Sequence, residues 1–193
     1  GVYVFCLAVI YFERQKNEAI LRAEQERASL RQAARKDSLT GLYNRTALRE
    51  AFDQLEERRE KASLVMVDLD RFKALNDTYG HTQGDICLQD TAAALRAEMG
   101  ENPVFRYGGD EFCALLWGEG AAEAAQRCRR AARRMERTGL CRRYGVSASF
   151  GVAEYVPELT AHQLLERADR ALYRAKAAHG AVRVYEESME NQT

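Results

Sequence analysis

The sequence lacks an excess of charge of either sign. Its 29 Lys and Arg residues match its 29 Asp and Glu residues, so the formal net charge at neutral pH is zero although 30% of the residues are charged. A nucleic-acid-binding protein usually carries a clear basic excess. The composition therefore argues against nucleic acid as a partner, while the 46% of hydrophobic residues are enough for the core of one ordinary domain.

The spacings typical of disulfide frameworks and zinc sites are also missing. The five cysteines are an odd number without a CxxC pair, and the three histidines stand far apart. Most of the cysteines lie inside apolar periodic runs, so we expect reduced, buried thiols of a cytosolic domain. They are Cys6, Cys87, Cys113, Cys128 and Cys141.

The longest uncharged apolar run, at residues 1–12, is too short to cross a bilayer. It reads GVYVFCLAVIYF and stops at ERQKNE, whereas a spanning helix needs about 20 such residues. It also lacks the basic start and the cleavage site of a signal peptide. Two interpretations stay open: the cytoplasmic end of a transmembrane helix, with Arg14 and Lys16 just inside, or the last strand of an upstream sensor domain.

Glycine and proline are absent from residues 13–36, which are rich in Ala, Glu, Arg and Gln. This composition favours a helix. Arg27 falls where a coiled coil needs an apolar residue, so the seam is weak. We expect a linker helix that pairs with the same helix of a second copy, and a single solvated helix is the alternative. The residues that fit the a/d stripe are Ile20, Ala23, Leu30 and Ala34.

The remaining residues alternate between helix and strand patterns. Short apolar runs bounded by turn residues indicate strands, and amphipathic runs indicate helices. Strands are expected at 63–70, 103–107, 111–117, 145–155 and 181–187, helices at about 46–59, 84–100, 120–138 and 158–180, and a loop around Asn76, Asp77 and Gly80. The order predicts an α+β fold in which helices flank a mostly antiparallel central sheet, preceded by the linker helix.

Two pairs of acidic residues lie at the ends of apolar strands. Asp68 and Asp70 end the first strand, and Asp110 and Glu111 follow a glycine pair at the tip of a hairpin. If the two strands are neighbours, the carboxylates converge and repel each other. Mg²⁺ relieves such repulsion and supports phosphoryl transfer. A solvated acidic turn is the alternative interpretation.

Five motifs in this order resemble the GGDEF family of diguanylate cyclases. The resemblance covers about residues 37–185, and the number and order of the motifs make it specific. The motifs are DSLTGLYNR (37–45), DLDRFKALNDTYGHTQGD (68–85), RYGGDEF (106–112), SASFGVA (147–153) and ADRALYRAK (168–176).

The resemblance implies a palm-like sheet related to those of nucleotidyl cyclases and polymerases. It implies that two GTP molecules condense into cyclic di-GMP with release of pyrophosphate. It also implies a homodimer, in which each protomer holds one GTP and each 3′-hydroxyl attacks the α-phosphate on the partner. Two Mg²⁺ or Mn²⁺ ions per active site are part of the implied chemistry.

The resemblance also implies roles for individual residues. Asp68 resembles the family's metal-binding aspartate, and Leu69 would offer its backbone carbonyl to the metal. Asp110 and Glu111 match the acid pair of the motif; we expect Asp110 to accept the proton of the 3′-hydroxyl and Glu111 to support the metal. Lys73 matches a phosphate-facing lysine that stabilises negative charge in the transition state, with a solvated lysine as the alternative.

A further set of residues matches the family's nucleotide contacts. Asn76 and Asp85 match the residues that read guanine, whose N–H groups suit a carboxylate acceptor. His81 matches a histidine beside the nucleotide, and Phe72 is expected to wall the ribose or base; structural roles stay open for both. The residues expected to meet the phosphates are Gly108, Gly109 and Lys176.

Two places depart from the family pattern. The Arg and Asp of the inhibitory RxxD motif would fall on Met99 and Asn102, so we expect no product inhibition through that site. After the last long helix the family continues to GRN, whereas this chain reads AAHGAVRV. Either Arg183 replaces the missing phosphate-binding arginine, or the affinity for the triphosphate is lower.

We divide the chain into an apolar remnant (1–12), a signalling linker helix (13–36), a GGDEF catalytic domain (37–187) and a tail (188–193). We expect control by an upstream sensor, membrane anchoring through the N-terminus, and a cytoplasmic catalytic domain of an inner-membrane protein. The alternative function is a catalytically weak or inactive module that binds GTP or cyclic di-GMP as a receptor. Asn76, Asp85 and the neutral charge argue against another nucleotidyl cyclase or a polymerase.

Overall fold

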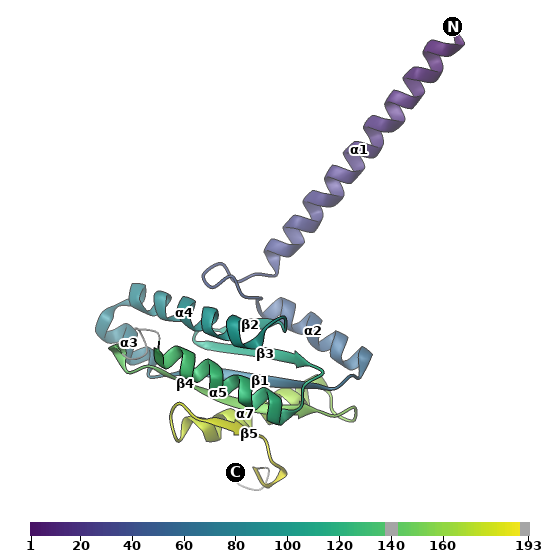
Figure 1. Ribbon diagram of the computed structural model, residues 1–193. Coiled ribbons are helices and arrows are strands. Elements are labelled where there is room, and N and C mark those ends of the chain that lie inside the picture. Colours follow the sequence, from purple (N-terminus) through teal and green to yellow (C-terminus); the bar gives the residue numbers. More distant parts are fainter. Residues whose placement is uncertain (138–142, 190–193) are drawn as a thin grey trace. The chain divides into compact units, whose positions relative to one another are not determined.

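The computed structural model describes residues 1–137 and 143–189, with only the backbone of residues 2 and 4–8 (Figure 1). The chain forms two compact units, Gly1–Lys36 and Asp37–Thr193. Each is considered by itself. Cys141, one of the cysteines expected to be buried, lies outside the described residues, as does the side chain of Cys6.

The first unit is a single α-helix, α1 (Val2–Ala34), of 33 residues. Residues 2–12 are its first turns, so the expectation of a strand from a sensor domain is wrong for them. No helix among the described residues is long and apolar enough to cross a membrane. Ile20 and Leu30 of the weak seam are 47% and 63% exposed.

The second unit alternates helices and strands (Figure 1). Its elements are α2 (Arg45–Arg58), β1 (Ala62–Asp70), α3 (Phe72–Tyr79), α4 (His81–Met99), β2 (Val104–Gly108), β3 (Glu111–Trp117), α5 (Ala121–Arg137), β4 (Ser147–Tyr155), α7 (Ala161–Lys176), β5 (Val182–Val184) and the short 3-10 helix η1 (Glu187–Met189). The expected strands and helices are all present, with ends that differ by a few residues.

One expected loop is a helix. Residues 72–79 form α3, although their turn-favouring Asn76 and Asp77 indicated irregular structure. Leu75 anchors the helix because its side chain is only 3% exposed. Gly80 does act as a breaker: it has φ of 85° and separates α3 from α4.

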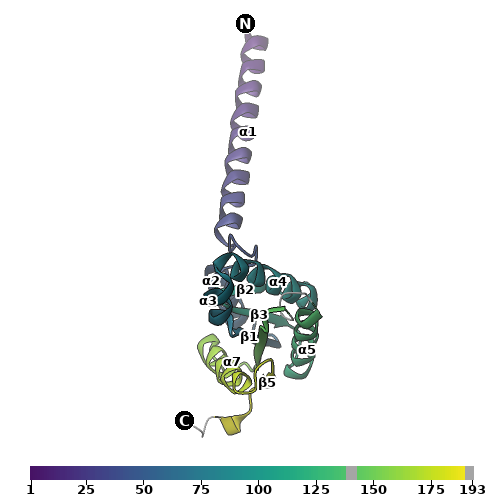
Figure 2. The same cartoon turned by 90° about the vertical axis from the view of Figure 1, so that its left-hand side faces the viewer.

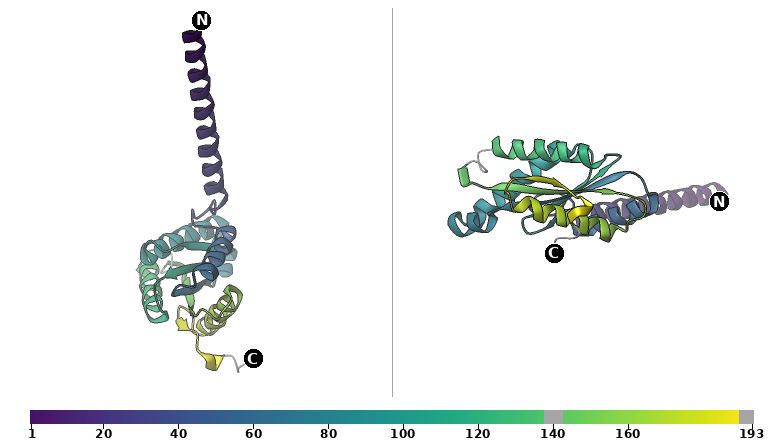
Figure 3. Two further views of the ribbon diagram at one scale, coloured as in Figure 1. Left: turned by 90° about the vertical axis from the view of Figure 1, so that its right-hand side faces the viewer. Right: turned by 90° about the horizontal axis from the view of Figure 1, so that it is seen from below.

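The strands form one five-stranded sheet in the order β2-β3-β1-β4-β5. The right-hand view of Figure 3 shows this sheet between two layers of helices. β1 pairs antiparallel with both β3 and β4, β2 pairs antiparallel with β3, and only β5 runs parallel to its neighbour. The expected α+β fold with a mostly antiparallel sheet is confirmed.

Two helices cover each face of the sheet (Figure 2). Because side chains alternate along a strand, Val65 and Val67 of β1 pack in the same core as α4 and α5. Leu64 and Met66 pack in the other core, with α2 and α7. All nine residues of β1 are buried, including the two acids at its end, Asp68 and Asp70.

Gly151 of β4 lies where the strand has no room for a side chain. A Cβ atom at this position would overlap the backbone of Ala168 and Leu172 in α7. The missing side chain therefore allows α7 to lie directly on β4. This close approach determines where the end of α7, with Lys176, lies relative to the sheet.

The described cysteine side chains are buried thiols. Cys87, Cys113 and Cys128 are at most 1% exposed. Burial raises the pKa of the Cys113 and Cys128 thiols far above the usual range. Both are therefore protonated and unreactive, as a packing role requires.

Candidate active site

The acidic residues of two neighbouring strands meet at one end of the sheet, where β1 ends and β3 begins. In the register of β1 and β3, Asp68 lies opposite Glu111. Asp110 adjoins this pair at the hairpin tip, where its backbone carbonyl accepts a hydrogen bond from the Leu69 N–H at 3.3 Å. The expected convergence of the carboxylates is therefore observed.

These carboxyl groups have perturbed acidity. Burial raises the pKa of Asp68, and the negative charges of Asp110 and Asp70 add to this; Lys176 opposes the shift without cancelling it. Burial also raises the pKa of Glu111, followed by the charges of Asp68 and Asp110. The protein thus holds several carboxyl groups where their negative charge is unfavourable, as is common at functional sites.

Lys176 is the cation that faces this cluster. Its Nζ lies 2.8 Å from Asp68 Oδ2, so the lysine contacts the acid. Burial alone would lower the pKa of Lys176, but its hydrogen bond to Asp68 and the nearby charges of Glu111 and Asp110 outweigh this and raise it. The sequence expectation of a phosphate contact for Lys176 stays a prediction.

The acidic residues of this site can be compared with the ligands that a divalent metal needs. In the described part of the chain, no three His, Cys, Asp or Glu side chains are grouped to hold an ion. Mg²⁺, however, usually takes only one or two carboxylates and completes its shell with water and substrate phosphates. The facing Asp68 and Glu111, with Asp110 beside them, fit that smaller demand, because a cation would relieve their mutual repulsion.

Asp70, two residues beyond Asp68, has a different environment. It is 5% exposed and accepts hydrogen bonds from the hydroxyls of Ser147 and Ser149 at 2.7 and 2.9 Å. The backbone N–H of Gly180 donates a third at 2.8 Å. Asp70 therefore joins β1, β4 and the segment after α7. Sequence reasoning missed these two serines, although SASFGVA was one of its motifs.

The expected nucleotide contacts lie on α3 and at the start of α4. Phe72 and Asn76 on α3 are half-buried, whereas Lys73 is exposed. On α4, His81 and Asp85 are exposed. Asn76 Oδ1 is buried and has no hydrogen-bond partner among the described residues.

The glycine pair forms an open turn. A Cβ atom on Gly108 or Gly109 would meet nothing within 4 Å, so the space above the turn is free. Gly109 has φ of 50°, which favours glycine. Arg106 donates to the Gly109 carbonyl from Nη2 at 2.8 Å, and its Nη1 lies 3.2 Å from Asp37 Oδ1. One arginine thus joins the start of the second unit to the glycine turn.

Asp37→Asn is expected to lower the free energy of unfolding by about 1 kcal/mol at neutral pH, since a charged hydrogen-bonded partner is lost. Burial alone would raise the pKa of Asp37, but hydrogen bonds from Thr40 and Arg106 outweigh it and lower the pKa. A lowered pKa stabilises the fold above the unfolded value near 3.8, and this contribution is lost as pH falls through the folded value. Urea denaturation across pH measures the difference.

The matched control for this change is Asp53→Asn on the exposed face of α2. It should leave stability unchanged at every pH. If the difference in the free energy of unfolding between wild type and Asp37→Asn stayed the same in acid, the stabilising role of the ionised Asp37 carboxylate would be contradicted.

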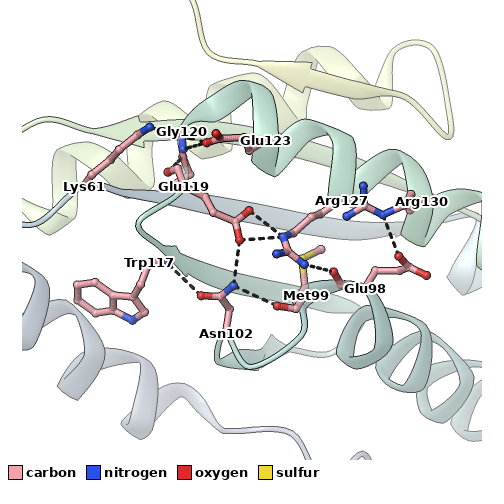
Figure 4. A network of polar contacts seen from close by, with 11 residues as sticks. Lys61, Glu98, Met99, Asn102, Trp117, Glu119, Gly120, Glu123, Arg127 and Arg130 are labelled. Carbon is pink, nitrogen blue, oxygen red and sulfur yellow. Dashed lines mark hydrogen bonds and ion pairs between the residues drawn. The ribbon is translucent and has the colours of Figure 1, made fainter.

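The positions expected for an inhibitory motif have structural roles (Figure 4). Met99 is completely buried. Asn102 Oδ1 accepts the Trp117 N–H at 3.0 Å, and Nδ2 donates to the Met99 carbonyl at 3.1 Å and to Glu119 at 3.3 Å. Arg127 lies 2.7 Å from Glu119 and completes the network. Asn102 therefore fastens the α4–β2 connection to the far end of β3.

Comparisons with known proteins agree with this architecture. Residues 34–181 match the family model described as diguanylate cyclase, GGDEF domain. The chain is 38% identical over 147 residues to diguanylate cyclase DgcS of Shewanella oneidensis, covering 74% of this chain and 49% of that protein. It is 36% identical over 176 residues to diguanylate cyclase VdcA of Vibrio cholerae, covering 86% of this chain and 52% of that protein.

A solved structure shows the same fold. The coiled coil and GGDEF domain of DgcB from Caulobacter crescentus, in complex with c-di-GMP, superimposes with a TM-score of 0.78 at 28% identity. The match covers 88% of this chain and 95% of that chain. The present chain spans about half the length of the two curated relatives.

The protein is an α+β domain with a mostly antiparallel sheet and an acidic site at a glycine turn. More specifically, the chain belongs to the GGDEF-domain family of diguanylate cyclases. Members of this family use GTP, act as dimers and generally depend on a divalent metal.

Proposed function

We propose that this protein is an active diguanylate cyclase that condenses two GTP molecules into cyclic di-GMP and pyrophosphate. One observation carries the proposal: Asp68 and Glu111 face each other across β1 and β3, with Asp110 beside them at an open glycine turn. A degenerate member that had become a receptor would have no use for this costly set of charges.

The position of each side chain indicates its role in the reaction. Asp110 is the acceptor of the 3′-hydroxyl proton, because it stands at the hairpin tip beside the open turn. Gly108 and Gly109 let the phosphates approach the backbone. Lys73, on the exposed face of α3, stabilises charge that develops on the phosphates. Lys176 favours the ionised form of Asp68 and so opposes the effect of its burial.

The metal proposal concerns Asp68, the Leu69 carbonyl, Asp110 and Glu111. Two Mg²⁺ or Mn²⁺ ions held there would supply charge neutralisation for an in-line phosphoryl displacement. The chain's contribution is to hold the carboxyl groups facing each other. The paired strands do this, since each acid is fixed by its place in the sheet register.

Guanine recognition is proposed for Asn76 and Asp85. Asn76 is half-buried on α3, and Asp85 lies on the adjoining helix. A site whose polar groups are satisfied only by guanine rejects adenine, because the wrong base leaves them unpaired. Phe72 and His81 complete the wall of this pocket.

The proposal includes a dimer controlled from upstream. Each domain would supply one GTP, so the two open turns must face each other in the active assembly. The linker helix α1 would set that arrangement through a weak seam, in response to an upstream sensor. Membrane anchoring through residues 1–12 and a cytoplasmic catalytic domain are part of the same proposal.

The direct test is to incubate the purified protein with GTP and Mg²⁺ and to resolve the nucleotides by chromatography. Formation of cyclic di-GMP that stops on chelation with EDTA supports the proposal. Absence of product even at high protein concentration, where dimers form, would instead favour a module that binds GTP or cyclic di-GMP without turnover.

Product inhibition through the usual site is expected to be absent. Cyclic di-GMP added at the start should leave the initial rate of pyrophosphate release unchanged, because Met99 is buried and Asn102 is engaged in the network described above. Asn102→Ala should be equally insensitive. Non-competitive inhibition by the product that disappears in Asn102→Ala would contradict this prediction.

A further inference from the structure

Gly84 lies where α4 passes closest to the side chain of Asn76. A Cβ atom on Gly84 would overlap Asn76 Oδ1, would lie 2.9 Å from Asn76 Cγ and would lie 3.2 Å from Phe72 Cζ. Gly84 is buried within α4 and makes no turn there, because its φ is not positive. Backbone conformation therefore gives no reason for glycine at this position.

Glycine also carries a local cost here. In the interior of a helix it is less favourable than alanine, since it loses more backbone entropy on folding. Gly84 is the fourth residue of α4, and the later turns of the helix contain alanine and leucine, which are good helix formers. A glycine in this helix needs a compensating reason, and the space taken by the Asn76 amide provides one.

The buried amide oxygen of Asn76 also indicates that the glycine makes room for this side chain. Its Oδ1 is buried without a partner in the described part of the chain, although buried polar atoms are nearly always hydrogen-bonded. The amide fills the space beside Gly84, where a Cβ atom would also lie close to Phe72 Cζ. An amide is a rigid plane, so wedging one end at Gly84 decides where the other end points.

We propose that Gly84 is a positioning residue for the nucleotide base. Its missing side chain leaves the space that holds the Asn76 amide oxygen, so that the amide nitrogen at the other end is held in one orientation, ready to donate to an acceptor on the edge of a purine. Phe72, on the same helix as Asn76, borders this space. Gly84 itself touches no substrate atom. This inference rests on the proposed function, because it assumes that Asn76 reads the base.

The test is a double-mutant cycle of Gly84→Ala and Asn76→Ala, with 3′-deoxy-GTP and Mg²⁺ as the binding probe. This nucleotide keeps the base and triphosphate but lacks the attacking hydroxyl, so it binds without condensing. Gly84→Ala should weaken its binding about tenfold, the scale of a lost hydrogen-bonded contact. In the Asn76→Ala background the same change should have no effect on binding, because no amide remains to be displaced.

Thermal melting separates positioning from a general packing role. With Asn76 present, the added methyl group should lower Tm or leave it unchanged, because the clash offsets the helix preference of alanine. With Asn76→Ala, Gly84→Ala should raise Tm, since only the preference remains. Gly120→Ala is the control: the atoms nearest to its Cβ would be side-chain ends of Lys61 and Glu154, and nucleotide binding should not change.

The outcomes distinguish the two claims. If wild type binds 3′-deoxy-GTP and Gly84→Ala weakens binding equally in both backgrounds, or not at all, the inference is wrong while the proposed function stands. If wild type binds no guanine nucleotide, the proposed function fails and the inference fails with it.

Discussion

Replacing Asp68 by Asn is expected to lower the kcat of cyclic di-GMP synthesis about 10³-fold, the scale seen when one electrostatic contact to the transition state is removed. Asp68 is 7% exposed, faces Glu111 and holds Lys176 at 2.8 Å. The amide keeps the shape of the side chain but removes the charge on which the metal and the lysine depend. The measurement is the rate of product formation under saturating GTP and Mg²⁺.

The shape-conserving change is chosen to separate chemistry from folding. Tm and far-ultraviolet circular dichroism should show that Asp68→Asn remains folded. Asp53→Asn, an exposed acid on α2, is the matched control and should retain full activity. A folded Asp68→Asn protein with a rate within tenfold of wild type would contradict a catalytic place for this carboxylate.

An excess of the inactive chain is expected to suppress wild type by dilution into mixed dimers. If both half-sites must work, a ninefold excess of Asp68→Asn leaves about 1% of dimers fully wild type, although about 10% of the chains are wild type. The activity per wild-type chain should therefore fall about tenfold, by the same mass-action arithmetic. The two chains are mixed at a protein concentration at which dimers form. Activity is measured after the subunits have exchanged.

An equal mass of unrelated protein is the control for this dilution and should not affect the rate. Activity that stays proportional to the number of wild-type chains would show that one catalytic domain suffices. That result would overturn the face-to-face arrangement of half-sites, but not the place of Asp68 within a single site.

The local sequence predicted secondary structure correctly where the apolar periodicity was strong and the bounding turn residues agreed with it. The strands of the hairpin and the long helices follow from apolar patterns that tertiary packing did not override. The segment 72–79 shows the limit. Asn76 and Asp77 favour turns, yet Leu75 is buried in the core and the segment forms α3. Burial of one apolar side chain outweighed weak local preferences.

The candidate site shows the same division. Asp110 and Glu111 were identifiable because they adjoin a glycine turn, and Asp68 because it ends a buried strand. The contact of Lys176 with Asp68 was not identifiable, since it depends on how α7 lies on β4 at Gly151. The serines that fix Asp70 were missed for a similar reason: they come from a strand far along the chain.

The sequence by itself determined the family, the identities of the acidic residues and the order of the elements, because motifs and periodicity are local properties of the chain. Only the tertiary structure decided that Asp68 faces Glu111, that Asn102 turns into a network at the far end of β3, and that Gly84 leaves room for Asn76. Sheet register and helix packing set these distances, and both arise from burial of side chains remote in sequence.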